Sequence, residues 1–146
     1  MKNNARIYNE LSEKAYKLID KEIAKYPKGQ KKSAVIAALA IAQREKGFVD
    51  SNTEQEIAEY LEMEEISVRE ILTFYNMFNK KSTGKYKISV CTNLPCALKN
   101  ARYTVEFFKE FLEVEVGETT KDGMFTLLEG ECFGACADAP VLLLNN

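Results

Sequence analysis

Histidine and tryptophan are absent from this chain of 146 residues, and proline occurs only three times. Without histidine, the chain lacks the side chain that most often transfers protons near neutral pH. It also contains neither the G-x-G-x-x-G motif of dinucleotide-binding folds nor a phosphate-binding P-loop. We therefore expect no autonomous catalytic site on this chain. Its four cysteines are nearly all of its soft metal ligands.

Excess positive charge and long apolar runs are missing as well. The chain has 20 basic and 22 acidic residues and a net charge of −2, which does not suit nucleic acid. Its longest apolar run, residues 34–42, is too short for a membrane span, and its first residues lack the apolar core of a secretory signal. We expect a cytoplasmic protein without direct membrane insertion. Structural disulfides are rare in that reducing compartment.

Helical periodicity dominates the first half of the chain. Apolar residues at helical spacing predict a helix over residues 11–26, which Pro27 and Gly29 end. Residues 33–46 are apolar on nearly all sides, which predicts a helix enclosed by others. Gly47 suits the position just after that helix, where a left-handed backbone is common.

Two further helices are predicted before the linker. One begins near Asn52, and the next opens with a capping box formed by Ser67 and Glu70. Residues 73–75 are interpreted as buried helix core rather than as a flavin contact. These four helices predict a small helical bundle as the first domain, residues 1–82.

The hydrophobic period changes in the second domain, residues 83–146. Alternation predicts a half-buried strand over 86–91, and further strands over 124–128 and 141–144. The unbroken apolar run of the last strand suggests burial on both faces. A helix is predicted over 97–112. Its bulk comes from five residues, Tyr103, Val105, Phe107, Phe108 and Phe111. The fold class is therefore α+β, with an α/β-like second domain.

The four cysteines form two close pairs, Cys91 with Cys96 and Cys132 with Cys136. The first pair lies at a strand end and a helix start, and the second in a loop between strands. Neither pair has the C-x-x-C spacing of thiol–disulfide oxidoreductases. Disulfides conflict with the expected compartment. A structural zinc site, whose usual spacing these pairs match only loosely, and a [2Fe–2S] cluster both remain open, and the spacing favours the cluster.

Residues around the cysteines suit a cluster ligand loop. Gly134 allows a close bend, and Pro95 stiffens the first loop. Four polar residues flank the cysteines: Thr92, Asn93, Glu131 and Asp138. The first two either donate to a sulfur or shape the turn. The two carboxylates are interpreted as solvated loop residues.

Several sequence stretches resemble one family in the expected order. They are Val90–Leu98, Gly117–Thr120, Asp122–Thr126, Glu131–Pro140 and, in the helical half, Tyr26-Pro27, Ser33-Ala34, Ala42-Gln43 and Thr73–Tyr75. The chain is similar to the small thioredoxin-like [2Fe–2S] subunit of NADH:quinone oxidoreductase (respiratory complex I). The similarity runs from about residue 20 to the end.

This resemblance implies one [2Fe–2S] cluster and a thioredoxin-like second domain. Cys91 and Cys96 would hold one iron, and Cys132 and Cys136 the other. The larger flavoprotein subunit would be the partner, with FMN and NADH bound there, and the helical domain would help to dock it. The chain would then exchange single electrons with that flavin, as part of a complex on the inner face of the cell membrane.

Two alternatives remain beside this function. Related subunits occur in NAD-linked formate dehydrogenases and hydrogenases. A different class is a non-redox module with a Cys₄ zinc site or a scaffold role. Members of the family usually continue beyond the strand at 141–144, whereas this chain stops at Asn145-Asn146. We expect this C-terminally shortened domain to expose apolar surface, to be less stable alone, and to be compensated by a partner or a dimer contact.

Overall fold

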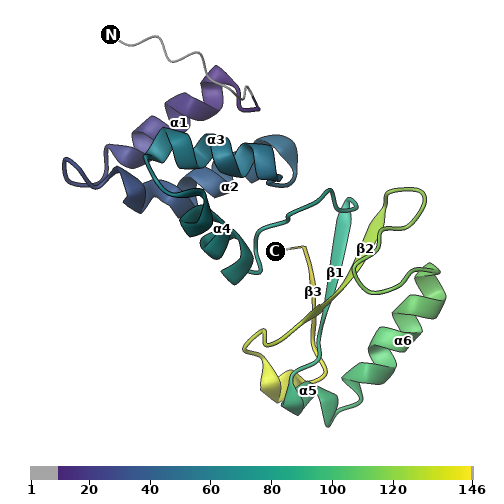
Figure 1. Ribbon diagram of the computed structural model, residues 1–146. Coiled ribbons are helices and arrows are strands. Elements are labelled where there is room, and N and C mark those ends of the chain that lie inside the picture. The colour runs from purple at the N-terminus through teal and green to yellow at the C-terminus, as the bar shows by residue number, and fades with distance from the viewer. Residues whose placement is uncertain (1–9, 146) are drawn as a thin grey trace. The chain divides into compact units, whose positions relative to one another are not determined.

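The computed structural model describes residues 10–145, and the chain divides between Ser82 and Thr83 into two compact units (Figure 1). The first unit contains α1 (Glu13–Ile23), the 3-10 helix η1 (Lys31–Ala34), α2 (Val35–Lys46), α3 (Ser51–Leu61) and α4 (Glu65–Phe74). Within residues 10–145, every helix is either too short or too polar to cross a bilayer.

Each of the first three helices has a defined cap, and the predicted end of α2 at Gly47 is confirmed, whereas α1 ends at Ile23, before the predicted stop at Pro27. The Ser12 hydroxyl accepts a hydrogen bond from the Ala15 backbone N–H and so caps α1. Gly47 ends α2 with a positive φ of 87°, where a side chain would be strained. At the start of α3, Asp50 accepts from the backbone N–H of Thr53 at 2.9 Å.

One hydrophobic core holds the helices of the first unit together. Its largest fully buried members are Ile19, Leu39, Val49, Ile57, Leu61 and Val68. The apolar stripe of α1 contributes to it, as its sequence pattern predicted. Helix α2 contributes too, but it is not enclosed on all sides as predicted, because Ile36 is 39% exposed. The predicted helical bundle is therefore confirmed.

The predicted start of α4 is wrong. The helix begins two residues before Ser67, and the Glu64 carbonyl at the N-cap position accepts from the Ser67 backbone N–H at 3.0 Å. Ser67 thus lies inside the first turn, where its hydroxyl cannot act as an N-cap. A backbone carbonyl took the role that the capping-box pattern had assigned to a side chain.

Residues 73–75 are surface residues, contrary to the predicted helix core. Val68 and Leu72 are buried one turn apart, and Phe74 follows Leu72 by two residues, on the opposite side of the helix. Phe74 is 79% exposed, and Tyr75, where the backbone leaves the helix, is 38% exposed. Phe78 is buried instead.

The second unit is a small sheet with one long helix against it. It contains β1 (Tyr86–Cys91), α5 (Leu94–Ala97), α6 (Ala101–Leu112), β2 (Phe125–Gly130), the 3-10 helix η2 (Cys136–Asp138) and β3 (Leu142–Leu144). In the described residues the strands follow the order β2-β1-β3, with β1 parallel to β2 and antiparallel to β3 (Figure 1). Because β1 and β2 are parallel, their carboxyl ends lie at the same edge of the sheet, with Cys91 opposite Gly130. The predicted α+β class is confirmed.

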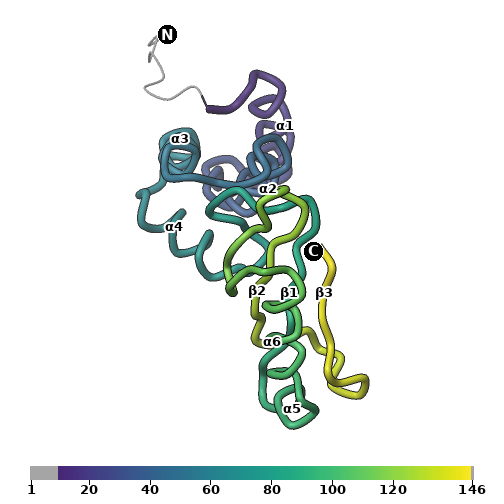
Figure 2. Tube along the Cα trace, turned by 90° about the vertical axis from the view of Figure 1, so that its right-hand side faces the viewer, coloured from purple at the N-terminus to yellow at the C-terminus, as the bar shows by residue number. Residues whose placement is uncertain are grey.

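Helix α6 packs along β1 and β2 (Figure 2). Ile88 and Val90 of β1, Leu127 of β2 and Val105 of α6 form the core between them. The predicted single helix is divided, because Asn100 has a positive φ of 64° between α5 and α6. In α6, Val105 and Phe108 face the core, whereas Tyr103, Phe107 and Phe111, which were also expected to supply its bulk, lie on the other side of the helix and are exposed.

Burial of the strands also differs from the prediction. In β1 the polar residues Lys87 and Ser89 are buried together with their apolar neighbours, so this central strand is not half-buried. The leucines of β3 are 40–58% exposed rather than buried on both faces. The cause is position, because β3 is a three-residue edge strand paired with β1 alone.

Candidate metal centre

Cys91 is the last residue of β1 and is 2% exposed. Its backbone N–H donates to the Val141 carbonyl at 3.0 Å, and the next N–H, of Thr92, donates to the Gly130 carbonyl at 2.9 Å. These two bonds join the end of β1 to the segments on both sides of it. The Cys91 sulfur is therefore held at a fixed point, where the sheet ends.

Cys96 lies in α5, directly after Pro95, and is 1% exposed. Asn93, with an extended backbone, occupies the N-cap position of this helix. The expected place at a helix start is confirmed, but α5 is one turn long, so its dipole supplies little extra stabilisation of a thiolate. Cys96, Cys91 and Ala101 form one buried apolar cluster.

Cys132 and Cys136 lie between β2 and β3, and both are exposed. Gly134 between them has a positive φ of 72°, a conformation that other residues rarely adopt. The expected bend at Gly134 is therefore present. Cys136 begins the 3-10 helix η2.

Two contacts bring the loop of the second pair against the first. The Cys91 thiol donates to the backbone carbonyl of Glu131 at 3.4 Å. Phe133 packs on the cluster of Cys91 and Cys96, together with Ala139 and Val141. This role of Phe133 was not predicted from the sequence, although an aromatic residue between two loop cysteines is a signal for a packing contact.

The loops meet, but the four sulfurs do not form one compact group. Within residues 10–145, no three cysteine or carboxylate side chains are gathered as they would be around a single metal ion. Glu131 and Asp138 are exposed, in agreement with their interpretation as solvated loop residues. The Thr92 backbone N–H donates to the Gly130 carbonyl, which joins this turn to the end of β2.

The donor set nevertheless fits a [2Fe–2S] cluster. All four cysteines carry free thiols, and each loop supplies two of them. Such a cluster takes four thiolates, and burial around the sulfurs influences its reduction potential. Cys91 and Cys96 already have an apolar environment, with Phe133 beside them.

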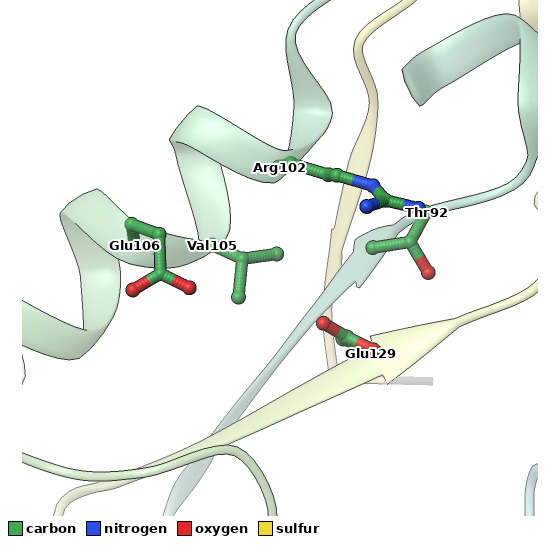
Figure 3. A pocket seen from close by; sticks show the side chains of 5 residues that line it. All are labelled: Thr92, Arg102, Val105, Glu106 and Glu129. Atoms are coloured by element: carbon green, nitrogen blue, oxygen red, sulfur yellow. The ribbon is translucent and has the colours of Figure 1, made fainter.

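A charged cavity lies next to the first cysteine loop, and it was not predicted from the sequence. Thr92, which follows Cys91, lines it with Arg102, Val105, Glu106 and Glu129 (Figure 3). Figure 3 shows the Arg102 side chain extending from α6 toward Thr92. One cation and two carboxylates therefore share this space. Because these residues come from β2, α6 and the end of β1, no local sequence pattern predicts the cavity.

Comparison with known proteins decides the family. Residues 19–146 match the family model described as thioredoxin-like [2Fe–2S] ferredoxin. The chain belongs to that family. Its cofactor is accordingly one [2Fe–2S] cluster, and the thioredoxin-like fold predicted for the second unit is confirmed.

Two named proteins are similar to most of this chain. The E subunit of the NADH-quinone oxidoreductase of Rickettsia conorii is 40% identical over 145 residues, which cover 98% of this chain and 87% of that protein. NADH dehydrogenase [ubiquinone] flavoprotein 2, mitochondrial, of Dictyostelium discoideum is 37% identical over 129 residues, 88% of this chain. The matched region is 52% of that relative, so the chain spans about half of its length.

A solved structure shares the fold. The NAD⁺-reducing [NiFe]-hydrogenase in its air-oxidized state matches 73% of this chain with a TM-score of 0.59 and 17% sequence identity. The match covers 19% of that hydrogenase chain. At this identity the likeness concerns the fold alone.

Proposed function

We propose that this chain is the [2Fe–2S] electron-transfer subunit of an NADH–quinone oxidoreductase. The observation that carries the proposal is its membership in the [2Fe–2S] family, together with two cysteine loops that meet at one end of a parallel strand pair. The names of its relatives at 37–40% identity support the parent complex. The chain is thus part of an oxidoreductase without a catalytic site of its own.

All four cysteines are proposed as the cluster ligands. Cys91 and Cys96 hold one iron, and Cys132 and Cys136 hold the other. The free thiols and the contact between the loops support this assignment. When bound, the cluster supplies the ability to accept and release one electron at a time.

The protein around the cysteines positions and shields them. Strand β1 holds Cys91 at a fixed point, and its neighbours exclude water from the Cys91 and Cys96 sulfurs. Phe133 adds an apolar ring to this shield and ties the second loop to the first. Water exclusion raises the electrostatic effect of every nearby charge and hydrogen bond on the site.

The partner in this proposal is the larger flavoprotein subunit, which holds FMN and NADH. The helical unit, residues 1–82, helps to dock it, and the exposed Phe74 is a candidate contact there. The complex lies on the inner face of the cell membrane. An NAD-linked hydrogenase is the second candidate parent, because the fold resembles part of an NAD⁺-reducing hydrogenase.

Anaerobic metal analysis tests the cluster. We expect two irons and two sulfides for each chain, with visible absorption that single Cys91→Ser, Cys96→Ser, Cys132→Ser or Cys136→Ser variants lose. Ser89→Ala, two residues before Cys91 on the same strand, is the matched control and should retain the spectrum. A colourless protein with one zinc would contradict the redox function and support the scaffold alternative. A single serine variant with an unchanged spectrum would remove that cysteine from the ligand set.

A second experiment tests the parent complex. The chain alone should not oxidise NADH, whereas NADH should reduce its cluster once the flavoprotein subunit is added. Electron paramagnetic resonance of the reduced cluster reports this step. An unreduced cluster in the presence of an active flavoprotein would contradict the proposed electron exchange.

A further inference from the structure

Three aromatic side chains follow one another at four-residue spacing along the outer side of α6. Tyr103, Phe107 and Phe111 are 75%, 50% and 71% exposed, and we call them the α6 stripe. The Phe107 and Phe111 rings stack, with centroids 5.8 Å apart and an interplanar angle of 9°. The opposite side of the helix packs against the rest of the second unit, because Ala101 and Val105 are buried there. Contiguous exposed apolar side chains of this size mark interaction sites on soluble proteins.

The α6 stripe has an acidic border. Five carboxylates line one hollow at the C-terminal end of α6: Glu106, Glu110, Glu113, Glu115 and Glu118. Lys109 is the cation among them, and it pairs with Glu106 at 3.2 Å and with Glu115 at 3.0 Å. Hydrogen bonds to Glu115 and Glu106 raise the pKa of Lys109, so it stays charged. The border is therefore strongly negative.

On this basis we infer that the α6 stripe and its acidic border form a docking surface for the partner subunit. The surface suits a partner with an apolar groove bordered by lysine or arginine side chains. Helix-in-groove recognition uses large apolar anchors about one turn apart on one face of a helix, and the α6 stripe provides three of them. Complementary charge then selects the partner and accelerates its association. The identity of the partner rests on the proposed function, whereas the surface itself does not.

A second copy of this chain is a poorer occupant. A two-fold dimer places the same patch on both sides of the interface, so the patch must be complementary to itself. The cations of α6 are Arg102 and Lys109, and both lie on the side of Glu106: Arg102 shares a cavity with it, and Lys109 pairs with it. Within α6, the stripe therefore has no basic border of its own to offer to the carboxylates of a second copy. A separate, basic partner meets this requirement.

Binding of the cluster-loaded chain to the purified flavoprotein subunit tests the inference. We expect Phe111→Ala to weaken binding by about tenfold or more, as for a buried aromatic anchor. Glu110→Lys combined with Glu113→Lys should slow association and reduce its dependence on salt. Two exposed residues of the second unit that lie outside α6 provide matched controls, Leu144→Ala and Lys85→Glu, and both should bind as the unaltered chain does. Visible absorption and thermal melting verify that each variant folds and carries its cluster.

The outcomes separate the two proposals. If the α6 variants bind the flavoprotein like the unaltered chain, the docking surface is overturned while the proposed function stands. If the unaltered chain forms a dimer that Phe111→Ala dissociates, a second copy is the occupant and the inference is wrong. If the unaltered chain does not bind the flavoprotein at all, the proposed function fails, and with it the partner named for this surface.

Discussion

The ring of Phe133 lies directly against the backbone of Gly130, so that a Cβ at Gly130 would come within 2.3 Å of the ring carbon Cζ. Gly130 is the residue of β2 that pairs with Cys91, and Phe133 also packs on the buried Cys91 and Cys96. One glycine therefore allows a ring from the second cysteine loop to cover the first. This contact explains how two loops that are distant in sequence keep a common position.

Gly130→Ala should displace Phe133 and loosen the second cysteine loop. Overpacking of this kind costs about 1–3 kcal/mol of unfolding free energy. We expect a lower melting temperature and a smaller fraction of chains with a cluster after reconstitution. Calorimetry and the ratio of visible to ultraviolet absorption measure these two effects.

Removing the ring separates a steric effect from a backbone effect. Phe133→Ala alone should also reduce cluster content, because the apolar cover of Cys91 and Cys96 is lost. In the double variant Gly130→Ala/Phe133→Ala the clash is absent, so the combined cost should be smaller than the sum of the single costs. Strictly additive costs would show that Gly130 acts independently of the ring.

Local chemistry predicted much of this fold from the sequence. Gly47 and Gly134 were assigned positions that need unusual backbone angles, and both have a positive φ. Alternation located β1, and helical spacing located α1. These features depend on a few neighbouring residues, which is why a sequence pattern predicts them.

The predictions that were wrong, for α6 and β3, have a different cause. The aromatic residues of α6 were expected to supply its bulk, but only Phe108 packs against the core, and Tyr103, Phe107 and Phe111 lie on the exposed side of the helix. An apolar run suggested that β3 is buried on both faces, but its place at the sheet edge decides its exposure. Orientation and neighbours are set by tertiary contacts, which a local pattern does not contain.

At the candidate site, too, local features were predicted and tertiary contacts were not. The sequence identified all four cysteines and the bend between the second pair. It did not give Phe133 its place over Cys91 and Cys96, or bring Arg102 and Glu129 into one cavity. Each of these contacts joins residues from different segments of the second unit.

The two cysteine pairs should differ in reactivity when the metal-free protein is prepared. Cys91 and Cys96 are 2% and 1% exposed, whereas Cys132 and Cys136 lie on the surface. A thiol reagent should therefore modify the second pair well before the first. Timed alkylation followed by peptide mass spectrometry measures the order, with the protein unfolded in urea as the control in which all four react together. Rapid modification of Cys91 in the folded chain would contradict the buried position.

Asp50 should contribute to stability as the N-cap of α3. Its carboxylate accepts from the backbone N–H and the hydroxyl of Thr53, and Lys46 lies 3.3 Å away. Asp50→Ala should cost about 1 kcal/mol near neutral pH, as for other lost caps, and Asp50→Asn should cost less because asparagine also caps helices. Urea unfolding followed by far-ultraviolet circular dichroism measures the difference.

The contribution of Asp50 should depend on pH. Burial alone would raise the pKa of Asp50, but the hydrogen bonds from Thr53 and the charge of Lys46 lower the pKa below the ordinary value of 3.8. A lowered folded-state pKa gives stability that is present above the unfolded value and lost as pH falls through the folded one. The gap between the unaltered chain and Asp50→Ala should therefore narrow below pH 3.8. A gap that is constant down to strong acid would contradict the role of the charge.

Glu54 of α3 should depend on its ion pair with Arg69. Its side chain is 3% exposed, and its carboxylate accepts from Nε of Arg69 at 2.8 Å. Arg69→Met leaves this buried carboxylate without its charged donor, which should cost about 1–3 kcal/mol. Because Arg69 is 47% exposed, water replaces part of the lost interaction, and the lower end of this range is expected.

Glu65→Gln is the control for the ion pair. Glu65 lies 3.6 Å from Arg69 on the surface, and loss of its charge should cost under about 0.5 kcal/mol. In Arg69→Met/Glu54→Met both charges are gone, so stability should recover beyond the single Arg69 variant. A double variant less stable than Arg69→Met would show that the Glu54 carboxylate stabilises the first unit through contacts other than Arg69.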